Sequence, residues 1–443
     1  MIQRKVIGWS IIMALGGFLF GFDTAVISGA EQSIQSYWHL SDLQHGFTIS
    51  IALIGTVTGA FFGRIPADSI GRKQSLVIIA FIFLIGSLGT AVATNWYLFV
   101  LLRFIGGLGV GASSVIAPIY ISEIAPASAR GRLVILFQFN IVLGILISYL
   151  SNYLIGLVFT DPWRYMLGIM AIPSLLFLIL LRFVPESPRW LILHKSQNDE
   201  ALKTLQLINP EGYEQDMANI IAAKNEEEQD VNAESLFNKR YRFPATLAVL
   251  FAFFNQVSGI NAIIYYAPRI FTMAGLGKSA ALLSTTGIGA VNLAFTMLAI
   301  WFIDSLGRKK LMFIGSLGLI VTLGLVSFSF YGAHVNGNYV TYLLMIYIAF
   351  FAFSQGAVIW VFISEIFPNQ VRAKGQTLGS FTHWVMATII AFSFPYITDK
   401  LGGGHTFMFF TVMMVLQLLF VWRMMPETKG KSLEQIERTL TMH

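Results

Sequence analysis

The sequence predicts an all-α membrane protein with twelve transmembrane helices in two six-helix halves. Three observations predict this fold. Of the 443 residues, 56% are hydrophobic and only 12% are charged, whereas ordinary soluble domains carry about 25% charged residues. Twelve apolar stretches are each long enough to span a bilayer, which takes about 20 residues of α-helix. Several short motifs of the first half of the chain return in the second half at a nearly constant offset.

The twelve apolar stretches define the expected helices in order. Six of them precede a long polar segment and six follow it. The expected spans cover residues 6–28, 47–67, 74–93, 98–122, 133–158 and 164–184 before that segment, and 244–271, 281–303, 311–332, 341–364, 375–398 and 406–425 after it. These spans divide the chain into an N-terminal half (1–184), a linker (185–243), a C-terminal half (244–425) and a tail (426–443).

The distribution of basic residues predicts the orientation. With the N-terminus in the cytoplasm, all but five of the 29 Lys and Arg residues lie on the cytoplasmic side; four lie outside, and Arg103 lies within a helix. Cytoplasmic loops of membrane proteins carry such an excess, so both termini are expected in the cytoplasm. The net charge of +6 therefore reflects orientation, and no nucleic-acid partner is expected. The chain has no Cys, which excludes disulfides and thiolate metal sites; no metal or cofactor is expected.

The polar linker is expected to be helical. Asp199 can cap a helix from Glu200 to Ile208, and a second, acid-rich helix is expected from Gly212 to Asp230. The linker holds no catalytic constellation, so a solvated helical connection is favoured over a separate enzymatic domain.

Three motif pairs support the division into halves. They lie 236, 242 and 241 residues apart, so the offset holds across the length of a half. In order they are Asp68-x-x-Gly71-Arg72-Lys73 with Asp304-x-x-Gly307-Arg308-Lys309, Ser122-Glu123-Ile124-Ala125-Pro126 with Ser364-Glu365-Ile366-Phe367-Pro368, and Pro185-Glu186-Ser187 with Pro426-Glu427-Thr428.

With these motifs the chain resembles the sugar porter family of the major facilitator superfamily over essentially its whole length. It is similar to the bacterial sugar/proton symporters of the xylose type and, somewhat less, to the facilitative glucose transporters. Further motifs that carry the resemblance are Gly-Phe-Asp-Thr-Ala-Val-Ile-Ser-Gly at 21–29, Arg-Phe-Ile-Gly-Gly at 103–107, Pro-Glu-Ser-Pro-Arg-Trp at 185–190, Gln-Val-Ser-Gly-Ile-Asn at 256–261 and Pro-Glu-Thr-Lys-Gly at 426–430. The resemblance implies two parallel six-helix halves that give alternating access to a site at the membrane midplane.

Two charged residues of the N-terminal half lie away from the ends of their expected spans. Asp23 is in the middle of the first span and Arg103 is in the fourth. Such residues are expensive in hydrocarbon and are functional by default. An ion pair would favour ionised Asp23, and loss of the Arg partner would favour the protonated form. The resemblance implies that this pair couples transport to protons; the alternative is a permanent structural salt bridge.

Amides and aromatic rings are the groups expected to hold a sugar, because amides pair with vicinal hydroxyls and rings pack on C–H faces. Asn255, Gln256 and Asn261 cluster in the seventh span, where Gly259 can relax the helix. The alternative is that they only join helices. Family positions add Gln138, Asn292, His383, Phe20, Trp360 and Trp384 to the expected substrate site, and Tyr265 and Tyr266, followed by Pro268, to an external gate.

Several positions depart from the family pattern. Asn255 stands where the relatives usually carry Gln. The tenth span reads Gln-Gly-Ala-Val-Ile-Trp at 355–360, without the usual proline, so a milder break is expected there. His383 replaces an amide and is open to three roles: hydroxyl donor, titrating group or packed neutral ring. Substrate identity therefore stays open.

A set of opposite charges lies at the helix ends that are expected to face the cytoplasm. One interpretation is membrane-side anchoring. The other, favoured by the repetition in both halves, is a lock of ion pairs that closes the inner side and breaks when it opens. The residues are Asp68, Arg72, Glu123 and Arg130 in the first half, and Asp304, Arg308, Glu365 and Arg372 in the second.

These features predict secondary active uptake of a monosaccharide coupled to proton symport. A passive sugar facilitator and an inositol/proton symporter are the alternatives. An enzyme is not expected, because acid/base, nucleophile or metal clusters at one membrane depth are missing from the sequence. The compact chain and the lack of Asn-x-Ser/Thr sequons favour a bacterial inner membrane, and the resemblance implies a monomer.

Overall fold

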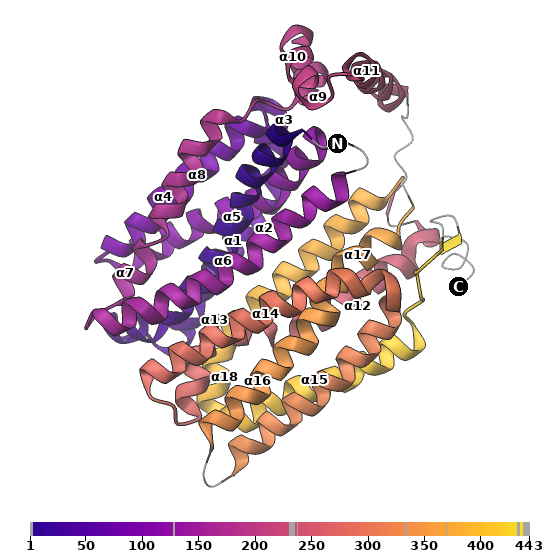
Figure 1. Ribbon diagram of the computed structural model, residues 1–443. Helices are drawn as coiled ribbons and strands as arrows, with labels where there is room; N and C mark the ends of the chain where they lie inside the picture. Colours follow the sequence, from indigo (N-terminus) through magenta and orange to yellow (C-terminus); the bar gives the residue numbers. More distant parts are fainter. Residues whose placement is uncertain are drawn as a thin grey trace. The chain divides into compact units, whose positions relative to one another are not determined.

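The computed structural model describes residues 3–126, 129–229, 235–236, 238–332, 335–368, 370–431 and 435–436, without the side chains at 130–131 and 223–229. All regular structure in this part of the chain is helical (Figure 1). Eleven of its helical stretches are long and apolar enough to cross a membrane. The predicted all-α fold is therefore confirmed.

The first six predicted spans are all helices. In order they are α1 (Arg4–Tyr37), α2 (Asp42–Phe62), α4 (Arg72–Val92), α5 (Trp96–Ile124), α6 (Arg130–Val158), and a sixth formed by α7 (Trp163–Gly168), α8 (Ala171–Leu180) and the short η1 (Leu181–Phe183); the short α3 (Arg64–Ile70) lies between α2 and α4. The start of α5 has a capping residue, because the Asn95 side chain accepts hydrogen bonds from the backbone N–H groups of Tyr97 and Leu98.

The described part of the predicted linker has four helical segments before η3, where the sequence predicted two helices. They are α9 (Pro188–Trp190), the π-helical η2 (Leu191–Lys195), α10 (Asn198–Ile208) and α11 (Tyr213–Gln229). The prediction that Asp199 caps α10 was wrong, because the helix begins at Asn198. Asp199 lies in the first turn of the helix, where the helix dipole stabilises a negative charge. Trp190 and Leu205 belong to a small hydrophobic cluster that packs α9, η2 and α10 together.

The second set of spans is also helical. It comprises η3 (Lys239–Tyr241) with α12 (Arg242–Val257) and α13 (Ile260–Met273), then α14 (Lys278–Leu306), α15 (Arg308–Tyr331), α16 (Gly337–Phe351) with the π-helical η4 (Ala352–Gly356) and α17 (Ala357–Glu365), and finally α18 (Arg372–Arg423).

The helix α18 contains the last two predicted spans. It is 52 residues long and has one residue with non-helical backbone angles, Gly402, at φ 78° and ψ 163°. An α-helix needs about 20 residues to cross the hydrocarbon, so α18 supplies two spans that meet at this glycine. With α18 counted twice, the eleven membrane-spanning stretches of the described residues become the twelve that the sequence predicted.

Close helix packing depends on small residues where α2 meets α5. A Cβ atom at Gly59 would lie 2.2 Å from the carbonyl oxygen of Leu108, and one at Gly111 would lie 2.1 Å from that of Thr56. Both distances are far inside van der Waals contact, so only glycine fits at these two positions. Small residues are the usual means of bringing membrane helices together, since apolar lipid tails leave little hydrophobic force between helices.

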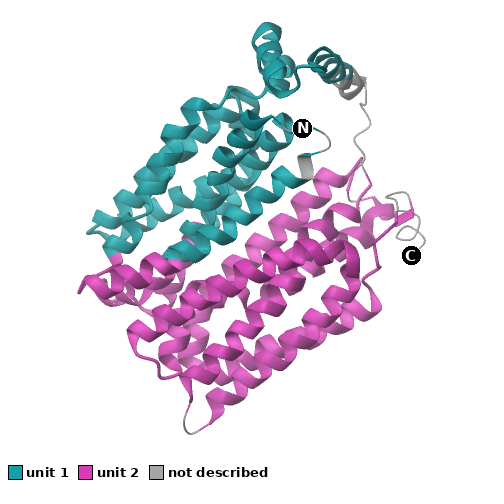
Figure 2. Ribbon diagram, in the orientation of Figure 1, with its two compact units in different colours: residues 1–26, 54–148, 164–232 teal, residues 27–53, 149–163, 233–443 magenta. Residues whose placement is uncertain are grey.

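The chain forms two compact units (Figure 2). Unit 1 consists of residues 1–26, 54–148 and 164–232, and unit 2 of residues 27–53, 149–163 and 233–443. The segments 27–53 and 149–163 of the N-terminal half thus pack with the C-terminal helices. The division into six-helix halves at 184 and 244 follows the sequence repeat and stays a prediction.

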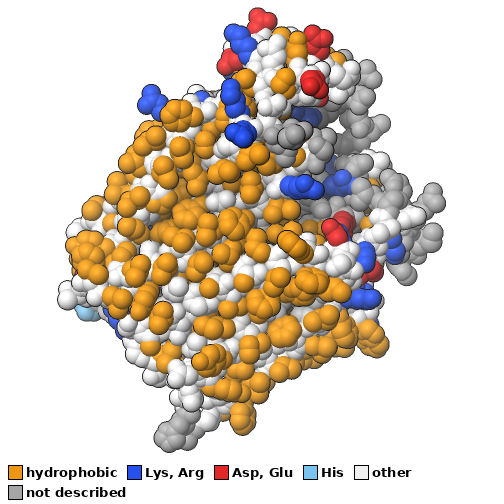
Figure 3. Space-filling view, in the orientation of Figure 1, with side chains coloured by type: hydrophobic (Ala, Val, Ile, Leu, Met, Phe, Trp, Pro, Cys, Tyr) orange, Lys and Arg blue, Asp and Glu red, His pale blue; other side chains and the backbone are white. Residues whose placement is uncertain are grey.

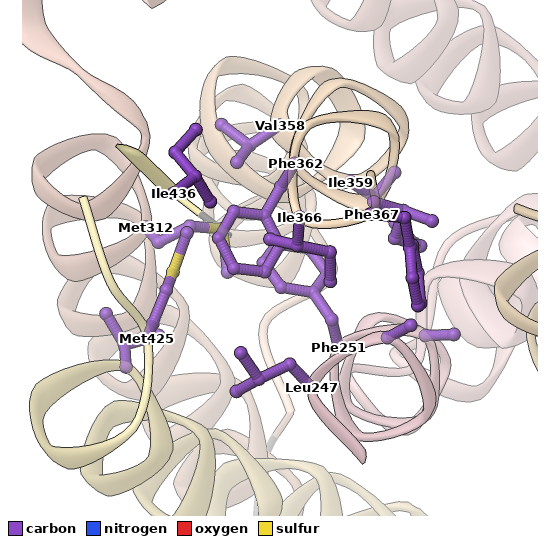
Figure 4. Close-up of a cluster of buried hydrophobic side chains, with 14 of the residues drawn as sticks. Leu247, Phe251, Met312, Val358, Ile359, Phe362, Ile366, Phe367, Met425 and Ile436 are labelled. Atoms are coloured by element: carbon purple, nitrogen blue, oxygen red, sulfur yellow. The ribbon is translucent and has the colours of Figure 1, made fainter. Parts of the chain in front are cut away.

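A hydrophobic core within unit 2 joins α12, α15, α17 and α18 (Figure 4). Phe251 of α12 stacks on Phe362 of α17 with 5.1 Å between ring centroids. Leu247 and Met312 lie in the same fully or nearly fully buried set, which also includes Ile436 of the tail. Close van der Waals packing of such side chains is the main force that holds membrane helices together, so this core holds together the helices that carry the site described below.

Hydrophobic side chains also cover the visible outer faces of the helices in each unit, while charged ones gather on the linker helices and near one end of unit 2 (Figure 3). Trp301 is 82% exposed and Phe328 is 75% exposed. Large apolar patches of this kind are rare on soluble proteins and mark contact with a membrane or a partner. The protein is therefore a multi-pass membrane protein.

Candidate functional site

The seventh span is broken at a single glycine. Gly259, between α12 and α13, has φ 87° and ψ 8°, a left-handed conformation that other residues rarely adopt. A Cβ at this position would lie 2.6 Å from the ring of Phe410. Ser258 Oγ donates to the Asn255 carbonyl at 2.6 Å, which satisfies part of the backbone that the break leaves without helical partners.

The three predicted amides of this span come together at the break. Gln256 Nε2 donates to Asn255 Oδ1 at 2.8 Å, and Asn261 Nδ2 donates to Gln256 Oε1 at 2.6 Å. All three residues are buried. The break turns the two helix ends so that amides five residues apart in the sequence share one hydrogen-bonded cluster.

His383 of α18 joins this cluster. Its ring nitrogens lie 3.1 and 3.2 Å from Gln256 Nε2. Because an amide N–H can only donate, the ring nitrogen that pairs with it accepts and carries no proton. The ring also lies 5.0 Å from Trp360 and 5.0 Å from Trp384, between centroids. The structure thus brings together six of the nine predicted substrate residues: three amides, one imidazole and two indoles.

The other three predicted substrate residues are placed separately. Phe20 lies on α1 and Gln138 on α6, both within unit 1 and both partly buried. Asn292 lies on α14 of unit 2, where its Oδ1 accepts a long hydrogen bond of 3.4 Å from Thr296. Their part in the site stays a prediction.

The tenth span changes its hydrogen-bond pattern where the family proline is absent. The π-helical η4 (Ala352–Gly356) follows α16 directly and leads into α17. Ala357 keeps its backbone N–H, which donates to the carbonyl of Ser354. The expected milder break is therefore a π-helical turn, a feature that occurs frequently at functional sites.

The two predicted gate tyrosines lie at a kink in α13. Tyr266 has non-helical angles (φ −125°, ψ 17°), two residues before Pro268. Its hydroxyl donates to the carbonyl of Ala391 at 2.8 Å, and its ring stacks on Phe394 at 5.1 Å between centroids. Tyr265 and Tyr266 are 2% and 0% exposed, so both are enclosed in unit 2.

Proline explains a second contact at this kink. Pro268 has no N–H, so it cannot donate to the carbonyl four residues earlier, that of Ile264. This carbonyl instead accepts from the hydroxyl of Tyr149 on α6 at 2.8 Å. The bond therefore replaces the missing helical one and joins the first half of the sequence to the seventh span inside unit 2.

The intramembrane pair of unit 1 is formed. Arg103 Nη1 lies 2.9 Å from Asp23 Oδ1, and both side chains are buried. In the part of the chain that the structure describes, Arg103 Nε and Nη2 have no further hydrogen-bond partner. A cavity lined by these two residues, Ser87 and Thr90 adjoins the pair. Among the described residues, the Asp23 carboxylate is thus the group that stabilises the buried positive charge of Arg103.

The repeated motifs of the two halves build the same hydrogen-bonded set twice. In unit 1, the guanidinium of Arg72 binds both oxygens of Glu123 at 3.1 Å, and its Nη1 donates to the carbonyl of Ala67. Ser187 Oγ donates to Glu123 at 2.5 Å. Asp68 lies 3.2 Å from Arg72.

In unit 2, Arg308 binds Glu365 at 3.2 and 2.7 Å and donates to the carbonyl of Ile303. Thr428 Oγ1 donates to Glu365 at 2.6 Å, and Asp304 lies 3.0 Å from Arg308. Six of the eight residues predicted for the lock are therefore ion-paired within their own half. Whether these sets act as a lock stays a prediction.

The remaining two residues of the predicted lock differ. Arg372 Nε donates to the carbonyl of Phe367 at 3.3 Å, and its Nη2 is buried with no partner among the described residues. The side chain of Arg130 lies outside the described residues, although α6 begins at this position.

Two further carboxylates complete these sets and were not predicted as site residues. Glu186 accepts from the backbone N–H groups of Arg72 and Lys73 at 3.1 Å, and Glu427 accepts from those of Arg308 and Lys309 at 3.0 Å. Each therefore binds the N-terminus of a helix, where a negative charge is stabilised. The signal was present in the repeated Pro-Glu motifs. Burial raises the pKa of Glu186 above its usual range, although the backbone donors oppose the shift.

A buried charged cluster at the end of α1 was also missed. Glu31 is 0% exposed and accepts from Arg269 Nη2 and His45 Nε2, each at 2.7 Å. Arg269 also donates to Gln35. Because the carboxylate only accepts, His45 Nε2 carries a proton. In the sequence, each of these charged residues stands out alone near the end of an apolar span. No sequence pattern indicates that they contact one another.

The chain is similar to known transport proteins over nearly its whole length. The family described as "Sugar (and other) transporter" matches residues 9–440. The arabinose-proton symporter of Bacillus subtilis is 38% identical over 435 residues, covering 97% of this chain and 94% of that protein. The D-xylose-proton symporter of Escherichia coli K12 is 36% identical over 472 aligned residues, covering 97% and 94%. The inward-open structure of the E. coli xylose transporter XylE has a TM-score of 0.86 at 35% identity, covering 98% of this chain and 100% of that one.

Proposed function

Because this chain belongs to the sugar transporter family and has the twelve-helix fold of the major facilitator superfamily, we propose that it takes up a monosaccharide together with protons by alternating access. The observation that carries the proposal is the buried pair of Asp23 and Arg103, 2.9 Å apart. An ion pair inside a membrane span is expensive to maintain and marks a functional site.

The sugar binds at the cluster of amides and rings. Asn255, Gln256, Asn261 and His383 offer uncharged donors and acceptors, which suit a neutral polyhydroxyl ligand. Trp360 and Trp384 flank the imidazole and supply apolar faces for the C–H groups of a sugar ring. Phe20, Gln138 and Asn292 are assigned to sugar binding from their family positions.

Asp23 is the proton carrier. While Arg103 is its partner, the carboxylate stays ionised, because a nearby positive charge stabilises the negative form. A conformational change that separates the two groups leaves a buried carboxylate, for which desolvation favours protonation. Alternation between these two states couples the sugar movement to a proton.

Opening and closing use the kinked helix α13 and the repeated ion-pair sets. Tyr265 and Tyr266 close the external side, with the kink at Tyr266 as the flexible point. The sets around Arg72 and Arg308, together with Arg130 and Arg372, hold the cytoplasmic side closed and release it when the site opens inward.

The protein lies in a bacterial inner membrane with both termini in the cytoplasm. The excess of Lys and Arg in the loops on that side supports the orientation. The resemblance to the sugar porter family supports a monomer.

The test records external pH in lightly buffered cells that express the protein while D-xylose, L-arabinose, D-glucose or myo-inositol is added. Transient alkalinisation by one of them supports proton symport and identifies the substrate. Uptake of label that equilibrates without a pH change or accumulation would instead establish a passive facilitator. Alkalinisation with inositol alone would establish an inositol symporter.

A further inference from the structure

A chain of buried polar side chains in unit 2 leads from α15 toward the amide cluster. Gln417 of α18 donates from Nε2 to Ser316 Oγ of α15 at 2.9 Å. Its Oε1 accepts from Nε2 of Gln355 in η4 at 2.8 Å. All three residues are 0% exposed. Polar side chains at such depth are costly unless they are paired, so the set calls for a role.

A backbone carbonyl fixes the direction of this chain. Ser316 Oγ donates to the carbonyl of Met312 at 2.7 Å, and a carbonyl can only accept. The serine oxygen must therefore accept from Gln417, which must present its NH2 group to Ser316 and its oxygen to Gln355. Gln355 in turn must present its NH2 group.

A second segment starts at the same residue. Asn255 Nδ2 donates to the backbone carbonyl of Gln355 at 3.4 Å, a long hydrogen bond. That contact orients the amide of Asn255, whose oxygen then accepts from Gln256, whose oxygen accepts from Asn261. The amide oxygen of Asn261 is the acceptor at the end of this segment. The position of Gln355 thus determines which atoms the amide cluster presents.

Gln355 also sits at the change of helical pattern. It is the fourth residue of the π-helical η4, whose formation is not imposed by proline, because Ala357 donates its own backbone N–H. The Oε1 atom of Gln355 is buried without a hydrogen-bond partner among the described residues. Leaving such an atom unpaired costs about 1–3 kcal/mol. An apolar side chain at this position would avoid that cost, so folding stability alone does not explain the amide.

We propose that Gln355 and Gln417, anchored by Ser316, are positioning residues that orient the amides of the substrate site. They touch no sugar themselves. They hold η4 in place and fix the donor and acceptor directions of Asn255, Gln256 and Asn261. The inference rests on the proposed function, since it assumes that these amides bind a sugar.

The test compares sugar affinity with thermal stability in the full-length protein. Binding of D-xylose, L-arabinose and D-glucose is measured by quenching of tryptophan fluorescence, which Trp360 and Trp384 report, and Tm is measured in the same detergent. The single variant Gln417→Leu removes the amide acceptor of Gln355 and the donor to Ser316, so Gln355 Nε2 keeps only Met414 Sδ at 3.4 Å and Ser316 keeps only its bond to the Met312 carbonyl. The triple variant Ser316→Ala, Gln355→Leu, Gln417→Leu removes all three polar groups together.

A matched control is available on α15. Thr322 is also buried, at 3% exposed against 0% for Ser316, but among the described residues its hydroxyl bonds to carbonyls of its own helix, those of Gly318 and Leu319. Thr322→Val and Ser316→Ala each remove one buried hydroxyl from this helix. Only Ser316→Ala is expected to weaken sugar binding.

We expect Gln417→Leu to raise the Kd about tenfold, because the amides that bind the sugar are then no longer held in one orientation. The triple variant should keep a Tm close to that of the wild type, because apolar replacement of all partners is nearly neutral, and still bind sugar about tenfold more weakly. A triple variant with the wild-type Kd would overturn the inference. If the wild type itself binds none of the sugars, the proposed function fails instead.

Discussion

Glu31 and Arg269 form a buried ion pair although they are 238 residues apart in the sequence, with 2.7 Å between Oε2 and Nη2. Glu31 belongs to α1 and Arg269 to α13. The pair therefore fastens a helix of the first half of the sequence to the seventh span, close to the kink at Tyr266. His45 contacts both the carboxylate and, ring to ring at 6.2 Å, Tyr266.

Replacing one member of this pair should destabilise the protein more than replacing both members. In Glu31→Gln the guanidinium of Arg269 loses its charged partner, and loss of one member of a buried pair typically costs about 3–5 kcal/mol. We expect the Tm of Glu31→Gln to fall clearly. The double variant Glu31→Gln, Arg269→Gln should recover part of the loss, because neither charge is then unpaired. Additive effects of the two single substitutions would show that the pair is not coupled.

Asp23→Asn should abolish accumulation and keep exchange. The substitution removes the titrating group but leaves the amides and rings of unit 2 unchanged. Cells that express the variant should equilibrate labelled sugar across the membrane, and counterflow in vesicles should continue. Asp399→Asn is the matched control, because this carboxylate is 57% exposed and pairs only with its neighbour Lys400. Full accumulation by Asp23→Asn would return the Asp23 and Arg103 pair to a structural role.

Tyr149→Phe should destabilise the kink in α13. The substitution removes the hydroxyl that donates to the carbonyl of Ile264, and a buried acceptor left unpaired costs about 1–3 kcal/mol. Adding Pro268→Ala to Tyr149→Phe supplies a backbone N–H for the same carbonyl, so the double variant should be more stable than Tyr149→Phe. Tm reports both effects. Tyr342→Phe, at a 65% exposed position, should leave Tm unchanged.

Glu186 should make stability fall as pH rises. Burial raises its pKa in the folded protein above the ordinary value of 4.5, so the folded state keeps the proton to a higher pH than the unfolded state. This contribution is fully present below the unfolded pKa and is lost as pH rises through the folded pKa. Tm measured from about pH 4 to 7 should fall less with pH in Glu186→Gln than in the wild type. Identical slopes would contradict the shift.

Much of the fold followed from the sequence, because membrane spans and repeats leave local signals. Twelve apolar stretches and paired motifs indicated the helices and the two related ion-pair sets. The break at Gly259 and the meeting of Asn255, Gln256 and Asn261 were also predictable, since these residues lie within one span. His383 was predicted only from its position in the family, because no local sequence pattern indicated it.

Contacts between distant helices were not predictable in the same way. Nothing in the sequence around Glu31 indicates Arg269, because the pairing depends on how α1 packs against α13. The hydroxyl of Tyr149 compensates for Pro268 for the same reason. The π-helical pattern at Gln355 depends on a partner 62 residues later, Gln417, and side-chain networks of this kind emerge only with the packing of the spans.

The turn at Gly402 has a consequence for biosynthesis. Only seven residues separate the last two predicted spans, and the helical pattern is interrupted at Gly402 alone. Only these seven residues, which include Asp399 and Lys400, have to be translocated between the spans, and each span can pack against the other as soon as both are made. We therefore expect them to enter the bilayer together as a helical hairpin.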